Sequence, residues 1–311
     1  MNQENVFTST GIKLLHHTEN VERIKKYHLA KPISLQLAPT SQCNLNCSFC
    51  SNANRTKHEE LLIYPTVKMI RELVRIGLKT VEWTGGGEPL LYSQIYVGIL
   101  TANLLGVKQG LITNGILLNE VPENVLTKLD WIRVSMNCLD YVKEIKIPNF
   151  HGALGFSYVV NTDSKPDAFD HLKEYIAKYH PSYVRIVPNC QATQEVQEEN
   201  NKRLSKIVNE LGPPFFYQAK HFSTPEKCYW GYLKPFVLHN GWVYPCSSVV
   251  LNDDSDKTFH SKYKWLRMED LADFYLQPMK GKNWGCSHCV FRNQNELIGS
   301  LLNPTGMEEF V

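Results

Sequence analysis

The sequence predicts an α/β fold, a partial (β/α)6 barrel of the TIM type that is followed by a small α+β module. Strand-like and helix-like segments alternate six times over the first two thirds of the chain. Six repeats are fewer than the eight of a full barrel, so we expect an open one. Beyond residue 213 the alternation gives way to short, hairpin-like runs. The chain has 311 residues, of which 43% are hydrophobic, and can therefore bury a large core.

The expected strands and helices follow one another from residue 18 to residue 188. A helix over about 18–28 precedes the first strand. Val67, Ile70 and Val74 recur at helical spacing, and Gly77 suits the end of that helix. The expected strands are 33–38, 79–84, 107–113, 131–136, 153–160 and 183–188. The expected helices between them are 66–77, 91–106, 123–129 and 168–179.

The C-terminal third is expected to fold as a separate module. The dipeptide Asn240-Gly241, inside the run 235–246, is a strong turn signal and predicts a hairpin. We place the boundary at about residues 212–220. The expected parts are therefore an N-terminal helical extension (1–32), a barrel (33–212) and the C-terminal module (213–311).

Charge and composition exclude several classes of protein. The formal net charge is +2, from 33 basic and 31 acidic residues, so nucleic acid is not a predicted partner. That test is weak for enzymes that act on free nucleotides. The N-terminus lacks the apolar core of a signal peptide, and no apolar run approaches the roughly 18 residues of a membrane span. Nine cysteines, clustered and odd in number, indicate a reducing cytoplasm and metal-binding thiolates.

Three cysteines stand together directly after the first expected strand, with the spacing Cys43-x3-Cys47-x2-Cys50. Ligands of parallel α/β sheets bind at the carboxyl ends of the strands, so this triad lies at the functional end. A structural zinc site needs four ligands, and three thiolates leave one coordination position open. A zinc knuckle and buried free cysteines are the simpler interpretations. Packing alone, however, gives no reason for this spacing.

The triad, with Phe49 beside its last cysteine, resembles the signature of the radical S-adenosylmethionine (radical SAM) enzymes. The resemblance implies that Cys43, Cys47 and Cys50 hold a 4Fe-4S cluster whose fourth iron binds SAM. It also implies a low-potential electron donor such as flavodoxin or ferredoxin. In that family the reduced cluster cleaves SAM to a 5′-deoxyadenosyl radical, which abstracts hydrogen from the substrate. The cofactor carries the difficult chemistry, and the protein positions it.

A glycine-rich loop after the second strand, "WTGGGEPLL", matches the family's Gly-Gly-Glu loop. The resemblance implies that this loop lies against the methionyl ammonium group of SAM. Glycine lets the backbone approach a ligand, and a carboxylate can balance the positive charge. Alone, a triple glycine more often marks an ordinary loop. The expected cofactor-binding residues here are Gly85, Gly86, Gly87 and Glu88.

Two weaker matches follow the third and fourth strands. "LITNG" resembles the family's turn at the ribose, which makes Thr113 and Asn114 candidates. "RVSMN" resembles the segment whose serine, here Ser135, reaches the ribose or the carboxylate of SAM. Thr-Asn-Gly is otherwise a common turn. The order of all four motifs along the chain is that of the family.

Four further cysteines are spaced Cys228-x17-Cys246-x39-Cys286-x2-Cys289. Four thiolates fit a closed site for either zinc or an iron–sulfur cluster. The pattern resembles the SPASM and shorter twitch modules of radical SAM enzymes, and four cysteines fit the twitch type with one auxiliary 4Fe-4S cluster. The layout is similar to that of 2-deoxy-scyllo-inosamine dehydrogenase. Zinc remains an alternative, because the ligand type alone does not exclude it.

Arg185, Cys138 and Cys190 also lie near the expected functional end. A buried arginine needs a partner, so Arg185 is a candidate catalytic residue that meets a substrate hydroxyl or carboxylate. A structural salt bridge is the alternative. Cys138 and Cys190 follow strands four and six and could return a hydrogen atom to a substrate. Packed free thiols are the more common case.

These features predict a radical SAM oxidoreductase, or an enzyme of a related radical transformation, that oxidises a polar small molecule. A maturase or epimerase of a ribosomal peptide precursor is the first alternative. The short segment 1–32 leaves little room for the leader-binding domain that many such enzymes carry. A zinc-stabilised binding protein without catalysis is the second alternative. It accounts for the C-terminal cysteines but not for the triad.

Overall fold

The computed structural model describes residues 6–50, 52–53, 55–56, 58–251, 261–287 and 289–310. Within these residues the strands form a ten-stranded sheet in the order β10-β9-β8-β1-β2-β3-β4-β5-β6-β7. Strands β1 to β7 are parallel, and β8 is parallel to β1, whereas β9 and β10 are antiparallel additions. The strands are β1 (Ser34–Ala38), β2 (Thr80–Trp83), β3 (Lys108–Thr113), β4 (Trp131–Ser135), β5 (Ala153–Val160), β6 (Tyr183–Pro188), β7 (Phe215–Tyr217), β8 (Phe236–Leu238), β9 (Trp242–Tyr244) and β10 (Leu266–Arg267).

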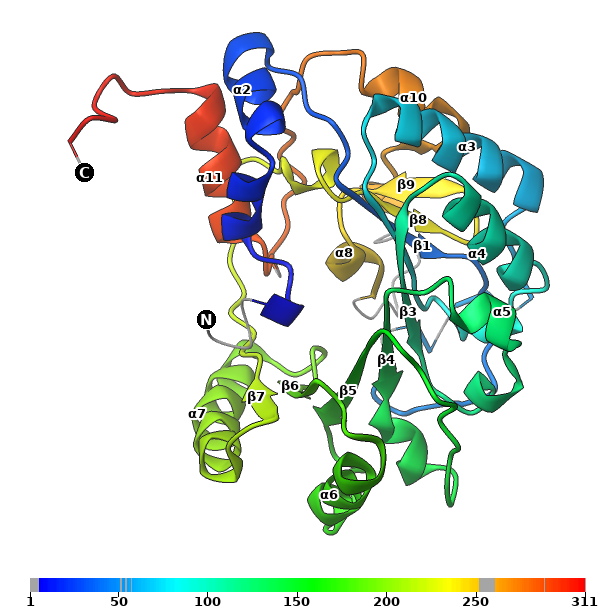
Figure 1. Cartoon of the computed structure of the whole chain (residues 1–311). Helices are drawn as coiled ribbons and strands as arrows, with labels where there is room; N and C mark the ends of the chain where they lie inside the picture. Colours follow the sequence, from blue (N-terminus) through cyan, green and yellow to red (C-terminus); the bar gives the residue numbers. More distant parts are fainter. Residues whose placement is uncertain are drawn as a thin grey trace.

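The helices that connect the strands cover the outside of the curved sheet, whereas α8 lies toward its concave side (Figure 1). Helices α2 and α11, from opposite ends of the chain, lie side by side. The α-helices are α2 (Thr18–Tyr27), α3 (Ile63–Ile76), α4 (Ile95–Leu104), α5 (Glu123–Leu126), α6 (Ala168–Tyr179), α7 (Gln194–Leu211), α8 (Ser247–Leu251), α10 (Leu271–Phe274) and α11 (Arg292–Leu302).

The predicted partial barrel is confirmed, because all six expected strands are present within two residues of their expected bounds. Strand β7 pairs in parallel with β6 and was not predicted from the sequence. The described connection between β4 and β5 holds a short 3-10 helix, η4 (Met136–Asp140), instead of an α-helix. The expected hairpin is β8–β9, and Gly241 takes a positive φ of 75° in its turn.

Side chains of the parallel strands alternate between an apolar outer face and a polar inner face, as the two-residue period of a strand requires. Leu35 and Leu37 of β1 are fully buried against the helices, and burying each is worth about 1.5–3 kcal/mol. The same core contains Met69, Ile70, Val81, Ile99, Leu111, Ile132, Val134, Phe156 and Ile186. The inner face is different, because Gln36 lies opposite Glu82 and Ser157 lies opposite Arg185. The inner face therefore carries polar side chains at these four positions.

A second core joins the two ends of the chain. Leu14 and Ile24 of the N-terminal segment pack with Trp230, Phe236 and Ile298 from the C-terminal third. Since β8 also continues the sheet from β1, the C-terminal third is part of the barrel wall. The division into three parts at residues 32 and 212 remains a prediction. In the described part of the chain, no helix combines the length and apolar character needed to cross a membrane.

Candidate active site

The cysteine triad lies in the loop that follows β1, at the carboxyl end of the parallel strands. Cys43, Cys47 and Cys50 are all partly exposed free thiols. Burial, together with the neighbouring Cys50 and Cys43, raises the pKa of Cys47 to about 11. The three sulfur atoms are thus close enough to influence one another's charge. A bound metal would reverse this effect, because coordination deprotonates a thiol.

Nitrogen donors lie near two of these sulfur atoms, and the sequence did not predict them. The backbone N–H of Leu45 donates to Cys43 Sγ at 3.5 Å, and Arg55 Nη1 lies 3.9 Å from Cys50 Sγ. Arg55 is itself held by the carbonyl oxygen of Ser41, which accepts from Nε at 2.6 Å. Donors of this kind stabilise thiolates and cluster sulfur. The only sequence signal for Arg55 is its position five residues after Cys50.

The glycine-rich loop packs directly on the backbone that leads into the triad. A Cβ atom on Gly87 would lie 2.0 Å from the carbonyl oxygen of Gln42, so no side chain fits there. The N–H of Glu88 donates to the same oxygen at 2.6 Å. Gly86 instead faces the end of β8, where a Cβ would approach His239 and Leu238 at 3.2 Å. At Gly87, the absent side chain permits contact between two loops of the site.

Glu88 connects the glycine-rich loop to the end of β3. Its carboxylate is only 2% exposed and accepts hydrogen bonds from Thr113 Oγ1 at 2.6 Å, Asn114 N at 2.7 Å and Leu90 N at 3.1 Å. Burial raises its pKa, and these three donors partly oppose the rise. An ionised carboxylate offers about four acceptor positions, so one remains for a further donor.

Asn114 links the end of β3 to the triad loop. Its Nδ2 donates at 2.7 Å to Oδ1 of Asn44, which lies between the first two cysteines of the triad. Thr113, Asn114, Glu88 and the triad loop are therefore joined by direct hydrogen bonds. Ser135 lies one strand further along, at the end of β4, where it pairs with Ser157 of β5.

Glu88→Ala is expected to lower the free energy of unfolding by roughly 1–3 kcal/mol, because it leaves the buried Thr113 hydroxyl and the Asn114 N–H without an acceptor. Urea denaturation measures this loss. Calorimetric titration with SAM on the folded variant measures a second effect, on cofactor binding. The exposed Glu120→Ala is the matched control. A stability equal to that of the wild type would contradict the connecting role of Glu88.

Phe49, Cys190 and Cys138 have different surroundings. The carbonyl oxygen of Phe49 accepts from Gln191 Nε2 at 3.2 Å, which links the triad to the loop after β6. Cys190, beside Gln191, is partly exposed. Cys138 is buried in the outer core, and burial raises its pKa to about 12. Of these two cysteines, Cys190 is the more accessible.

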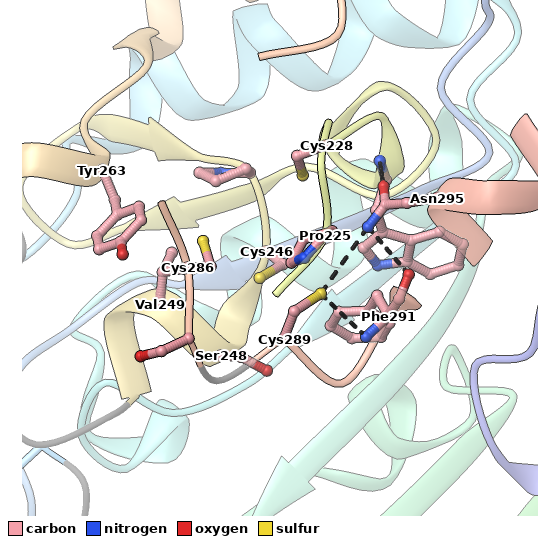
Figure 2. Close-up of a pocket in the computed structure, with 13 residues that line it drawn as sticks. Pro225, Cys228, Cys246, Ser248, Val249, Tyr263, Cys286, Cys289, Phe291 and Asn295 are labelled. Carbon is pink, nitrogen blue, oxygen red and sulfur yellow. Dashed lines mark hydrogen bonds between the residues drawn. The ribbon is translucent and has the colours of Figure 1, made fainter. Parts of the chain in front are cut away.

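The four C-terminal cysteines line one pocket (Figure 2). Two backbone bridges bring their chain segments together, from Ser223 to Cys289 and from Cys228 to Lys282. Burial, together with the nearby Cys289 and Cys286, raises the pKa of Cys246 to about 12. The rest of the lining is mostly apolar and includes Pro225, Trp230, Pro245, Val249, Tyr263 and Phe291.

Asn295 and Phe291 provide donors to this pocket. Asn295 Nδ2 lies 3.9 Å from Cys289 Sγ, and the N–H of Phe291 donates to the same sulfur at 3.3 Å. Four thiols, an apolar lining and N–H donors to sulfur fit an iron–sulfur cluster. Among the residues that the structure describes, no three Cys, His, Asp or Glu side chains are arranged to hold a single metal ion.

Arg185 lies on the inner face of β6. Its guanidinium donates to Ser157 Oγ at 2.9 and 3.1 Å and to Gln218 Oε1 at 3.0 Å. Burial, and then the nearby Arg133, lower its pKa to about 9. The partners of Arg185 among the described residues are therefore neutral oxygen atoms, and its contact with a substrate remains a prediction.

Comparison with known proteins matches part of the chain to a known superfamily. Residues 37–145 match the radical SAM superfamily, and these residues contain the triad, the glycine-rich loop and the Thr113–Asn114 turn. The suspected superfamily is thus confirmed. Its cofactors, SAM and a 4Fe-4S cluster, fit the thiols and loops of this site.

Particular relatives cover different parts of the chain. The GTP 3′,8-cyclase of Chlorobaculum tepidum is 34% identical over 35% of this chain and 34% of its own length. The chain thus spans well under half the length of such curated relatives. The PqqA peptide cyclase of Bradyrhizobium diazoefficiens is 22% identical over 84% of this chain and 79% of its own. The structure of Streptococcus suis SuiB bound to its precursor peptide SuiA is similar at 15% identity and a TM-score of 0.56. The similarity covers 87% of this chain and 71% of SuiB, which agrees with the predicted fold class.

Proposed function

We propose that the chain is an enzyme that reductively cleaves SAM and uses the resulting radical to oxidise a polar small molecule. The observation that carries this proposal is the convergence of the triad loop, the glycine-rich loop and the end of β3 around the buried Glu88. When bound, the 4Fe-4S cluster and SAM would supply one-electron cleavage of a C–S bond and the 5′-deoxyadenosyl radical.

The residues of the chain have distinct roles in this proposal. Cys43, Cys47 and Cys50 would hold the cluster, and Arg55 would steady the sulfur of Cys50. The remaining acceptor position of Glu88 would receive the ammonium group of SAM. Gly85, Gly86 and Gly87 would shape the loop beside it. Thr113, Asn114 and Ser135 would contact the ribose or the carboxylate, and Phe49 would lie beside the adenosyl group.

Oxidation requires a second electron acceptor. Hydrogen abstraction leaves a substrate radical, which must lose one electron and one proton to give a stable oxidised product. We assign the acceptor to an auxiliary 4Fe-4S cluster held by Cys228, Cys246, Cys286 and Cys289. Four protein thiolates leave no position for SAM on that cluster. A low-potential donor such as flavodoxin or ferredoxin would reduce the first cluster.

Modification of a peptide precursor is the second candidate. The match to the PqqA peptide cyclase favours it, because that match extends over 84% of the chain. The match to a GTP cyclase, although shorter, favours a small molecule. The polar inner face of the barrel also favours a small, polar substrate over an extended chain.

Deuterium transfer tests the proposal directly. The anaerobically reconstituted and reduced protein is incubated with SAM and deuterated candidates, among them nucleotides, sugars and short peptides. Formation of 5′-deoxyadenosine that carries deuterium from a small molecule is the expected result. Transfer from a peptide alone would select the second candidate. A protein that holds iron and sulfide in both sites yet never cleaves SAM would refute the proposal.

A further inference from the structure

The inner face of the barrel carries more positive than negative charge. Among the inward-facing residues of the described strands β1 to β7, the acidic side chain is Glu82 of β2. Lys234 Nζ lies 2.6 Å from its carboxylate, and Gln36 Nε2 donates to it at 2.9 Å. Burial alone would raise the pKa of Glu82, but Lys234, and after it Arg133, hold the pKa below its ordinary value. Glu82 is therefore already paired with Lys234, and these strands offer Arg133 and Arg185 no further acidic side chain.

These two arginines are bound to neutral groups. The hydrogen bonds of Arg185 go to Ser157 and Gln218. Arg133 lies over the ring of Trp131 at 5.5 Å, and its buried Nε has no hydrogen-bond partner in the part of the chain that the structure describes. A guanidinium has five N–H donors, and burying a charge without a counter-charge is costly. Two guanidinium groups close to each other add repulsion to that cost. An anion between them would remove both penalties.

Aromatic rings close the barrel on the amino-terminal side of the arginines. The Trp131 ring lies so close over Gly110, and the Tyr183 ring over Gly155, that a Cβ on either glycine would meet the ring at 2.1 Å. Phe7 stacks on Tyr183 with ring centroids 4.2 Å apart. Arg185 follows Tyr183 by two residues, so it lies one step nearer the carboxyl ends of the strands. A group bound by Arg185 would therefore rest above this aromatic layer, on the side of the triad loop.

We infer that Arg185 and Arg133 bind an anionic group of the substrate, a carboxylate or a phosphate, on the inner face of the barrel. Arginine suits this role because its planar guanidinium can donate two parallel hydrogen bonds to such a group. Ser157 and Gln218 position Arg185 for it. The inference rests on the proposed function and narrows its substrate to an anionic small molecule, whose other end would face the SAM-binding loops.

Direct binding of simple anions tests the inference without catalysis. Reconstituted protein is titrated by calorimetry with inorganic pyrophosphate and, separately, with succinate, at low ionic strength and without reductant. The titrations are made with and without saturating SAM, so that anions at the SAM site are recognised. We expect Arg185→Gln and Arg133→Gln each to weaken binding roughly ten- to hundred-fold, the range for a charge-assisted hydrogen bond. Arg292→Gln, at an exposed arginine paired with Glu296, is the matched control and should change nothing.

Thermal stability separates a ligand-binding role from a structural one. Without anions, Arg185→Gln should melt at the wild-type temperature or above it, because a buried charge without a counter-charge is removed. The anion should raise the melting temperature of the wild type but not that of the variant. Should Arg185→Gln fail to fold, Arg185→Lys keeps the charge, loses the bidentate geometry and should still bind more weakly.

The two anions distinguish a phosphorylated substrate from a carboxylate. Preference for pyrophosphate supports the first and preference for succinate the second. Equal affinities of wild type, Arg185→Gln and Arg133→Gln would overturn the inference, as would a wild type that binds neither anion. Neither result bears on SAM cleavage, so the proposed function is judged separately.

Discussion

Replacing any one of Cys43, Cys47 and Cys50 with alanine is expected to reduce SAM cleavage to background and leave the protein folded. Three thiolates are the whole protein ligand set of a cluster with one open iron, so loss of one removes the cluster or its geometry. The fold should survive, because all three side chains are partly exposed and lie in a loop after β1. Anaerobic assays of 5′-deoxyadenosine, with iron analysis and circular dichroism of each variant, measure the effect.

Cys190→Ala is the matched control for the triad variants. Cys190 is also partly exposed, and its neighbour Gln191 contacts the triad loop, but it stands outside the motif. It should retain both the cluster and SAM cleavage. Cleavage at the wild-type rate in any triad variant would show that these three cysteines do not hold the cluster, whatever the control shows.

The parts of the structure that local sequence patterns encode could be predicted. The six parallel strands are apolar runs separated by helical periodicity, and both patterns arise from residues close in the chain. The triad is similarly local, since its spacing alone distinguishes it from scattered core cysteines. Strand β7 was missed because it has only three residues, Phe215–Tyr217, and follows directly on a proline pair.

Contacts between distant segments could not be read from the sequence. Glu88 was expected to face SAM, but no pattern indicated that Thr113 and Asn114 would supply two of its donors. The same limit applies to Gly87, whose neighbour Gln42 lies 45 residues earlier. Arg133 and Arg185 belong to different strands, and only the register of β4, β5 and β6 brings them near each other.

The double variant Cys286→Ala with Cys289→Ala is expected to abolish formation of oxidised product while 5′-deoxyadenosine still forms. Both cysteines line the C-terminal pocket, and their loss leaves two thiolates of four. SAM cleavage depends on the other cluster and needs only the first electron. The substrate radical would then find no acceptor for its second electron and would be reduced or trapped.

Stability must be controlled in this variant, because a bound metal centre generally stabilises the fold of the segments that hold it. Circular dichroism and the iron content of the triad site should match those of the wild type before product is measured. Ser287→Ala, at a residue between the two cysteines that also lines the pocket, is a matched control that keeps all four thiols.

If a folded double variant forms oxidised product at the wild-type rate, the C-terminal site is structural. A redox-neutral reaction, with the accessible Cys190 or the buried Cys138 returning hydrogen to the substrate radical, would then replace oxidation. The pocket lining argues for a redox role, because N–H donors to sulfur and an apolar surrounding are the features by which a protein tunes the potential of a cluster.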